Sequence, residues 1–485
     1  MASIWSETCH IEERKPLPHD MKSEITVIGA GMAGILIANA LQAAGHQVIV
    51  LEAGRIAGGQ TRNTTAKITS QHGMVYGHLI QALGEERARQ YAMANEAAIR
   101  EYRRMIEEQK IHCDLEERSA YVYGHDLQIL EAEANAAAKL GLPSSLVRNN
   151  PLPIPMAGAV RFEHQAQFHP LKFIRAISGA LTVYEHTRVS SVEDRAIITD
   201  RGKVWAEQIV FACHYPFINF PGMFFSRLHQ ERSYVLALKN AARVDGMWIG
   251  SGKEAYSFRN YGAFLLLGGG GHRTGDNKKG GRYEALRQKA REWFPDCHEA
   301  ACWSAQDCIT PDAVPYIGRY AASRPHWFVA TGFQKWGMTS SMVSALLLRD
   351  LMDGKENPWA DVFDPRRLEA ESLPGIISDA GQAVKGLAKR VFQIPRIDAQ
   401  KIPAGHGGIV QLDNGKVGVY KDKDGAIHPV DIQCPHLGCQ LEWNPDERSW
   451  DCPCHGSRFD HLGRLISGPA KEGIAVRPSP NKQVL

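Results

Sequence analysis

The order of apolar and polar positions divides this 485-residue chain into two parts of different character. Residues 25–52 give an apolar strand, a glycine-rich turn, a helix of small residues and a second apolar strand. Residues 216–303 contain alternating apolar runs, which predict strands of a mixed sheet. After residue 402 the apolar runs become short and turns separate them. The pattern therefore predicts an α/β domain followed by a smaller all-β domain.

Prolines mark the boundary between the two parts. The segment from Leu373 to Ile397 has apolar positions at helical spacing between two prolines, which predicts an amphipathic linker helix. We expect this helix to pack on the first domain; a helix lying on a membrane surface is the alternative. The predicted divisions are an N-terminal extension, a large domain whose substrate part is mainly 216–303, a linker and a β domain, at residues 1–21, 22–365, 366–398 and 399–485.

Composition and charge exclude several classes of function. The sequence carries a net charge of +3, with 44% hydrophobic and 22% charged residues, which is ordinary for a folded protein. This balance predicts no nucleic-acid partner. No apolar run reaches the length of about eighteen residues that an integral membrane segment needs. The polar start of the chain predicts a cytoplasmic protein.

Glycines stand at three fixed positions in the turn after the first strand. Gly29 permits a tight turn, Gly31 lets the backbone approach a pyrophosphate, and Gly34 lets the helix pack closely on the strand. Ala33 belongs to the same turn, and Glu52 follows the second strand, where an acid binds a ribose hydroxyl. The N-terminus of the helix completes an anion site. The sequence therefore predicts a dinucleotide-binding site.

Cysteine and histidine pairs stand in two short motifs near the end of the chain. CPHLGC supplies Cys434 and His436, and CPCHGS supplies Cys452 and His455. Two thiolates and two imidazoles are the ligands of a Rieske 2Fe–2S cluster, which accepts electrons more readily than an all-cysteine cluster. The alternative is a tetrahedral zinc site, which takes the same residue types.

The complete strings CPHLGC and CPCHGS resemble those of respiratory-complex Rieske proteins. The resemblance implies a disulfide between Cys439 and Cys454, one in each ligand loop, and a hydrogen-bond donor at Ser457. Phe459 departs from the pattern, because those proteins usually carry a tyrosine that donates to a ligand sulfur. The loss of that donor is expected to lower the reduction potential.

The stretch after the second apolar strand indicates which dinucleotide binds. EAGRIAGGQTRNTTAKITSQHG resembles the flavin loop of the D-amino-acid oxidase and glycine oxidase (DAO) superfamily, and HQAQFHPLKFIRAI, IVFACHYPF and FVATGFQKWGMTSSMVSALLLRDLM extend the resemblance over most of residues 22–365. The resemblance implies a glutathione-reductase-type domain that binds FAD noncovalently, because Cys308 is too close to Thr310 to match the cysteine that binds FAD covalently in some relatives. The further residues that it places near FAD are Arg55, Gly59, Thr64, Thr65, Ala66, Val189, Ala212, Gly332, Gly337, Met338 and Thr339.

Three side chains are candidates for catalysis on the same resemblance. Lys67 would place a cation near the flavin, where it can stabilise the reduced ring or activate oxygen. His169 is a candidate base, and Lys335 is expected at the rim of the ring. A solvated lysine and a structural histidine are the alternatives. The polar candidates on the substrate side are Tyr234, Arg259, Tyr261, His272 and Arg273.

These expectations combine into a two-cofactor oxidoreductase. We expect FAD to take a hydride from a small amine or amino-acid-like substrate, and the cluster to pass electrons singly to an external ferredoxin, cytochrome or quinone-linked carrier. Two alternatives remain open. Electrons can flow in reverse, from the cluster to FAD for substrate reduction or monooxygenation, or the chain can be a noncatalytic electron-transfer or redox-sensing module.

Overall fold

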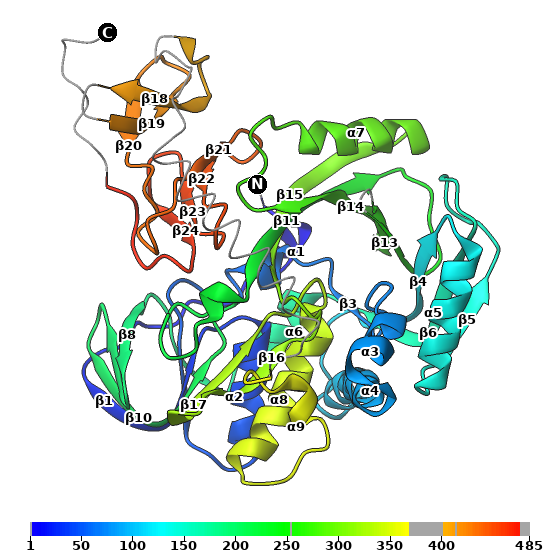
Figure 1. Cartoon of the computed structure of the whole chain (residues 1–485), viewed down its shortest axis with the longest axis horizontal. Helices are drawn as coiled ribbons and strands as arrows, with labels where there is room; N and C mark the ends of the chain where they lie inside the picture. The colour runs from blue at the N-terminus through cyan, green and yellow to red at the C-terminus, as the bar shows by residue number, and fades with distance from the viewer. Residues whose placement is uncertain (1, 253–254, 368–400, 413–414, 476–485) are drawn as a thin grey trace.

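The structure is a computed structural model that describes residues 2–252, 255–367, 401–412 and 415–475. A large body combines two sheets with their helices, and a smaller β body lies beside it (Figure 1). The smaller body contains the C-terminal strands, as predicted. The predicted linker helix, residues 373–397, lies outside the described residues, as does the rest of the predicted linker after residue 367.

A mainly parallel sheet forms the base of the large body. Its path is β16 (Tyr316–Ala321), β17 (Arg324–Thr331), β10 (Lys203–Phe211), β1 (Met21–Ile28), β2 (Val48–Leu51) and β7 (Thr182–Tyr184). The hairpin of β8 (Val189–Glu193) and β9 (Ala196–Thr199) joins it through β10. The central strands are buried runs rich in valine and isoleucine, as expected of a parallel sheet covered on both faces.

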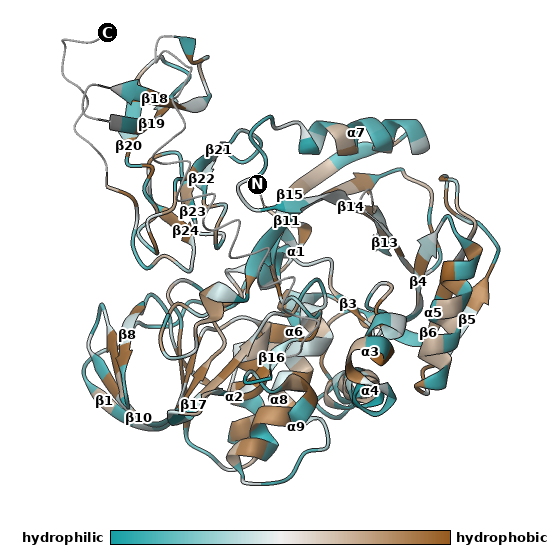
Figure 2. Cartoon of the chain, viewed as in Figure 1, coloured by the Kyte–Doolittle hydropathy of each residue, from teal (hydrophilic) through white to brown (hydrophobic). Residues whose placement is uncertain are grey.

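Two helices with many small residues pack together beneath this sheet. They are α2 (Met32–Ala43) and α8 (Gly337–Met352), and α4 (Glu85–Glu108) packs on α8. Hydrophobic residues are concentrated on α2, α8 and α9 (Ala360–Phe363) (Figure 2). α2 follows β1 and α8 follows β17, so both helices begin at the carboxyl edge of the parallel sheet. That edge is where ligands bind in folds of this kind.

A second, mixed sheet covers the carboxyl edge. Its path is β15 (His298–Ile309), β11 (His229–Lys239), β14 (Phe264–Arg273), β13 (Ser257–Tyr261), β12 (Met247–Gly250), β4 (Glu116–Gly124), β6 (Gly158–Gln167) and β3 (Lys67–Ile68), with β5 (Ser144–Val147) beside β6. The predicted substrate region 216–303 supplies part of this sheet, and residues 67–167 supply the rest. The two parts join where β12 runs parallel to β4, a long-range pairing that no local pattern reveals.

The remaining helical elements lie around the two sheets. They are α3 (Tyr76–Leu83), α5 (Leu127–Lys139), α6 (Pro170–Ile177), α7 (Arg282–Trp293) and the short 3-10 turns η1 (Gln60–Asn63) and η2 (Phe224–Ser226). Within the described ranges, every helix is too short or too polar to cross a membrane.

The N-terminal extension folds onto the large body. Its helix α1 (Ile4–Thr8) buries Trp5 completely, and the indole donates a hydrogen bond of 2.7 Å to Thr64 O. Farther along, the Arg14 amide donates to Glu185 Oε2 at 2.8 Å. The extension therefore covers the loop that follows β2.

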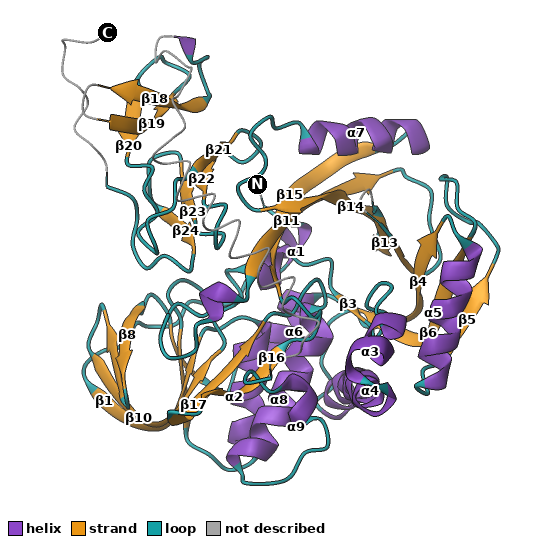
Figure 3. Cartoon of the chain, in the orientation of Figure 1, coloured by secondary structure: helices purple, strands orange, loops and turns teal. Residues whose placement is uncertain are grey.

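The smaller body is built from antiparallel sheets (Figure 3). One contains β18 (Gly407–Leu412), β19 (Gly415–Lys421) and β20 (Ile427–Val430), and the other contains β21 (Glu442–Asn444), β22 (Ser449–Asp451), β23 (Arg458–Asp460) and β24 (Leu465–Ser467). Its core includes Trp450, which is fully buried with its ring 5.0 Å from that of Trp443. The second sheet lies on the side of the large body in Figure 3.

A buried ion-pair network joins the two bodies. Glu447, between β21 and β22, lies 2.5 Å from Arg232 of β11 and 3.2 Å from Arg458 of β23. Although burial opposes ionisation, the two guanidinium groups lower the pKa of Glu447 to about 2. Breaking such a pair leaves an uncompensated buried charge, so the network favours one docked arrangement.

Glu447→Gln is expected to weaken this docking. The substitution leaves two guanidinium groups buried without their shared carboxylate, which costs about 3 kcal/mol. Because the folded-state pKa is lowered, the stabilisation is complete above about pH 5 and is lost as the pH falls toward 2. Thermal unfolding between about pH 3 and 7 measures both effects. The exposed Glu472→Gln is the control, and equal melting temperatures for the two variants at neutral pH would rule out this role.

Candidate functional site

A cavity of about 560 Å³ lies at the carboxyl edge of the parallel sheet. Its walls come from the turn after β1, the loop after β2, the N-terminus of α8 and residues between 465 and 471 of the smaller body. Its size is within the usual range of ligand pockets. The predicted cofactor residues that line it are Gly29, Gly31, Ala33, Glu52, Arg55, Gly59, Thr64, Val189, Ala212, Gly337 and Met338.

The glycine turn at one end of the cavity has no room for side chains. A Cβ on Gly34 would lie 1.8 Å from Gly29 O, so α2 touches the turn directly. Gly29 has a φ of +108°, and a Cβ there would lie 2.6 Å from Ala212 O. Gly31 lines the cavity at the N-terminus of α2, where the positive end of the helix dipole favours a pyrophosphate.

Glu52 follows β2 at the edge of the cavity. Its Oε1 accepts a hydrogen bond of 2.7 Å from the Gly54 amide, and its Oε2 accepts one of 2.8 Å from the Ala30 amide. Burial raises the pKa of Glu52, while these two hydrogen bonds act in the opposite direction. The carboxyl group thus ties the glycine turn to the segment that follows the second strand.

The start of α8 is anchored at the other end of the cavity. The Tyr102 hydroxyl donates to Met338 O at 3.0 Å, and the Thr339 hydroxyl donates to Thr69 O at 3.2 Å. The first residues of the helix, Gly337 among them, line the cavity. The helix dipole therefore favours negative charge in this part of the cavity.

Five of the predicted cofactor residues are absent from the lining of the cavity, namely Gly34, Thr65, Ala66, Gly332 and Thr339. Arg259 donates through Nη1 to Thr65 O at 2.5 Å and to Ala66 O at 2.7 Å. Gly332 has a φ of +72°, and a Cβ there would lie 2.4 Å from the Thr310 side chain. These residues support the wall of the cavity.

Lys67 lies outside the cavity lining in the described part of the chain. Its Nζ donates a hydrogen bond of 3.2 Å to Trp248 O. Burial lowers the pKa of Lys67 to about 7, and the charge of Arg259 adds to the effect. The structure therefore places the Lys67 ammonium group against β12.

His169 is also absent from the cavity lining. It caps α6, where its Nδ1 accepts a hydrogen bond of 3.3 Å from the Lys172 amide, and its Nε2 lies 2.9 Å from Thr8 Oγ1. Burial lowers the pKa of His169 to about 4, so the ring is neutral at pH 7. These contacts fit the structural alternative for this histidine.

Lys335 lines the cavity. Its Nζ lies 3.1 Å from Asp307 Oδ2 and 3.2 Å from Glu231 Oε2. Although burial opposes the charged form, the two carboxylates raise the pKa of Lys335, so the side chain is a cation. His229 Nε2 also lies 3.8 Å from Glu231 Oε1, so Lys335 belongs to a larger group of paired charges.

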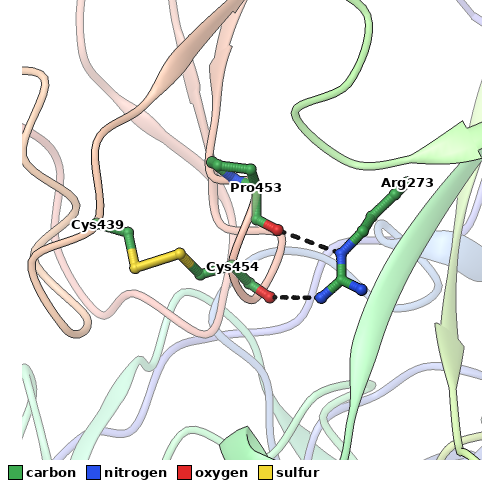
Figure 4. The surroundings of a disulfide bond; sticks show 4 residues. All are labelled: Arg273, Cys439, Pro453 and Cys454. Carbon is green, nitrogen blue, oxygen red and sulfur yellow. Dashed lines mark hydrogen bonds between the residues drawn. A yellow bond between two sulfur atoms is a disulfide. The ribbon is translucent and has the colours of Figure 1, made fainter. Parts of the chain in front are cut away.

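The polar candidates for the substrate side lie in different places, and none lines the cavity in the ranges that the structure describes. Arg259 and Tyr261 pack against the Trp5 ring of α1. The Tyr234 hydroxyl lies 3.0 Å from His272 Nε2. Arg273 extends to the smaller body and donates hydrogen bonds to a loop there, away from the cavity (Figure 4).

The four predicted cluster ligands meet in the two loops of the smaller body. The rings of His436 and His455 lie 4.9 Å apart, and the buried thiols of Cys434 and Cys452 are hydrogen-bonded neighbours. Nδ1 of His436 is buried without a hydrogen-bond partner among the described residues, which leaves it available to a metal. The Ser457 hydroxyl hydrogen-bonds the Cys434 thiol. Two thiols beside two imidazoles suit the two irons of a Rieske cluster.

A disulfide between Cys439 and Cys454 joins the two ligand loops (Figure 4). Arg273 of β14 donates hydrogen bonds of 3.3 Å to Pro453 O and Cys454 O, so a side chain of the large body holds the second loop. Phe459 is fully buried on the strand that follows this loop.

Two glutamines that the sequence analysis did not select connect the cavity to the second ligand loop. Gln230 Nε2 donates to His455 O at 2.6 Å, and Gln306 Nε2 donates to Gly456 O at 2.7 Å. Gln306 also lines the cavity, and its amide group donates to Gln230 Oε1 at 2.6 Å. No local motif marks these residues, because their role arises only when the two bodies dock.

Asn219 is a further contact that the sequence does not mark. His436 donates through Nε2 to Asn219 Oδ1 at 2.8 Å. Asn219 lies in the loop between β10 and η2, which no motif of the sequence analysis includes. The large body thus touches both histidine-bearing loops.

Comparison with known proteins identifies both parts of the chain. The family described as FAD dependent oxidoreductase (DAO) matches residues 24–351, and the Rieske [2Fe-2S] domain family matches residues 394–478. The chain belongs to the DAO family of FAD-dependent oxidoreductases. It is an enzyme that takes FAD in its large domain and a 2Fe–2S cluster in its Rieske domain, and the zinc alternative is set aside.

One relative matches nearly the whole chain, and another matches the Rieske domain alone. The putative Rieske 2Fe-2S iron-sulfur protein YhfW of Bacillus subtilis is 34% identical over 487 residues, which is 96% of each chain. The cytochrome b6-f complex iron-sulfur subunit of Chlorobaculum thiosulfatiphilum is 35% identical over 95 residues, which is 20% of this chain and 48% of the subunit.

Solved structures share the fold of the FAD domain. The L-proline dehydrogenase from P. horikoshii superposes with a TM-score of 0.60 at 18% identity and covers 72% of this chain and 98% of its own. The glycine oxidase from Geobacillus kaustophilus superposes with a TM-score of 0.58 at 19% identity and covers 72% of this chain and 99% of its own.

Gly34→Ala is expected to abolish FAD binding. The new methyl group would collide with Gly29 O, so the turn would have to move away from α2 and lose its pyrophosphate site. The flavin-to-protein absorbance ratio of the purified variant measures the loss. Gly179→Ala, at an exposed position with room for a Cβ, should keep its flavin. Full FAD content in Gly34→Ala would contradict the assignment.

Cys434→Ser is expected to remove the cluster and leave FAD in place. A serine hydroxyl is a poor replacement for a thiolate ligand of iron. Iron analysis and low-temperature EPR should show the loss, while the flavin absorbance stays unchanged. Cys297→Ser, in the FAD domain, is the matched control. A variant that retains a full Rieske EPR signal would exclude Cys434 from the ligand set.

Proposed function

We propose that this enzyme is a dehydrogenase that oxidises a small amine or amino-acid-like substrate and passes the electrons through its Rieske domain to an external carrier. When bound, FAD accepts a hydride and the cluster carries one electron at a time. A hydride removes two electrons from the substrate, so a one-electron carrier must be reduced twice in each turnover.

The observation that carries this proposal is a cavity wall shared by both domains. Residues between Leu465 and Lys471 of the Rieske domain line the same cavity as the glycine turn of the FAD domain. Gln306 lines it as well, and its side chain bonds to Gly456 in the cluster loop. A short series of bonds therefore leads from the cavity to the cluster ligands, which supports electron transfer within one chain.

The proposed substrate class rests on the solved structures of similar fold and not on the charge of the cavity. The charged side chains of the lining are more often basic than acidic, namely Arg55, Arg62, Arg188, Lys335 and Lys471 against Glu52 and Asp307. Arg55 lines the cavity but lies 2.9 Å from the buried carboxylate of Glu185. The L-proline dehydrogenase and glycine oxidase of similar fold are named for amino-acid substrates, and we extend that broad class to this chain.

Anaerobic addition of amines, amino acids and N-methylated amines to the holoenzyme tests the proposal. One of these classes is expected to bleach the flavin while a Rieske EPR signal grows. In Cys434→Ser the same substrate should bleach the flavin without that signal. Bleaching without cluster reduction in the unsubstituted enzyme would disprove the relay. If no compound bleaches the flavin and a reduced ferredoxin reduces both centres, electrons flow in the reverse direction.

A further inference from the structure

An apolar side chain of the Rieske domain lies in the wall of the FAD cavity. Ile466 of β24 is 51% exposed, and among the large apolar side chains exposed in the described part of the chain it is the one that lines the cavity. One exposed isoleucine is ordinary on a protein surface. In a cavity that takes a ligand, however, apolar side chains supply much of the contact area. The position of Ile466, and not its exposure, therefore indicates a ligand contact.

A hydrogen bond from the FAD domain holds the segment that carries Ile466. Gly468 O accepts a hydrogen bond of 3.2 Å from Gln230 Nε2 of β11. The same amide group donates to His455 O at 2.6 Å, so one buried side chain holds both this segment and the second cluster loop. Residues 465–471, the wall segment, are thus held against the cavity by the FAD domain itself.

The wall segment also contacts the surroundings of the cluster. Ala470 lines the cavity, and its amide donates a hydrogen bond of 2.9 Å to Ser457 Oγ. The Ser457 hydroxyl in turn hydrogen-bonds the Cys434 thiol. One segment of the Rieske domain therefore connects the cavity with a cluster ligand.

Gln306 joins the parts of the cavity wall that come from the two domains. Its backbone amide donates to Gln60 Oε1 at 2.7 Å, and Gln60 lines the cavity in the loop after β2. Its side chain donates to Gly456 O at 2.7 Å. The loop after β2 and the second cluster loop are therefore bonded to one residue that itself lines the cavity.

A series of contacts joins the wall segment to the glycine turn, which indicates FAD as its ligand. A Cβ on Gly29 would lie 3.1 Å from Cys213 Cα. His214 is the next residue, and its Nε2 lies 3.2 Å from Gln230 Oε1. Gln230 in turn donates to Gly468 O. The glycine turn takes the pyrophosphate of a dinucleotide, whereas a substrate must meet the flavin ring.

We propose that the Rieske domain supplies part of the FAD site, with Ile466 of the wall segment packing against the bound cofactor. The contact is noncovalent, so no bond forms or breaks and no electron moves when FAD binds. Because the cofactor then touches both domains, it also stabilises their docked arrangement. The inference concerns retention of the cofactor and holds for either direction of electron flow.

Titration of the deflavinated full chain with FAD, followed by flavin fluorescence, measures the contact. Ile466→Ser is expected to raise the FAD dissociation constant about fivefold, because it removes apolar contact area. Ile466→Leu keeps an apolar side chain of the same size and should restore most of the affinity. Ile129→Ser is the matched control, since Ile129 is 59% exposed on α5 and absent from the cavity lining. The Rieske EPR signal of each variant checks that the cluster domain is folded.

Amide hydrogen exchange tests the same contact without a substitution. Addition of FAD to the deflavinated chain is expected to slow exchange in the wall segment by about threefold or more. The strand β19, which is absent from the cavity lining, is the internal control. Equal FAD dissociation constants for Ile466→Ser and Ile129→Ser would overturn the proposal. Unchanged exchange in the wall segment, or equal slowing in β19, would also overturn it.

Discussion

Two buried hydrogen bonds hold the second cluster loop against the FAD cavity, and the proposed relay depends on them. Gln230 donates to His455 O and Gln306 donates to Gly456 O, and both glutamines are 1% exposed. Separation of the domains would break both hydrogen bonds and replace them with hydrogen bonds to water. Gly456 has a φ of +80°, and a Cβ there would lie 2.6 Å from Gln230. The close approach of loop and cavity therefore requires glycine at this position.

Charged contacts fix the orientation of the Rieske domain around that approach. Glu447 lies between Arg232 of the FAD domain and Arg458 of its own domain, and Arg273 binds carbonyl groups of the cluster loop. Apolar contacts alone would tolerate a shift of one surface along the other. A buried ion pair permits few arrangements, because no water is present to take the place of a lost partner. The charged contacts of the interface thus fix the position of the Rieske domain, so that Gln230 and Gln306 can reach the second cluster loop.

The sequence predicted those parts of the site whose residues lie close together in the chain. The glycine turn around Gly31 and the paired cysteine and histidine motifs belong to this class. Side chains whose surroundings come from distant segments were harder to place. His169 was a candidate base, but the N-terminal helix supplies its neighbours Trp5 and Thr8. Arg273 was expected near the substrate, but its strand ends at the Rieske domain, which no local pattern could indicate.

In an electron relay within one chain, the cluster must be accessible both to the flavin and to an external carrier. If both histidine ligands pointed into the FAD domain, an external carrier could approach only after the Rieske domain had moved away. Docking instead covers His455 and leaves His436 partly exposed beside Asn219. The two rings lie 4.9 Å apart, and the partly exposed His436 is the ligand that solvent can reach while the interface stays intact. The buried network around Glu447, which would be costly to break in every turnover, is compatible with this arrangement and would oppose one that required repeated undocking.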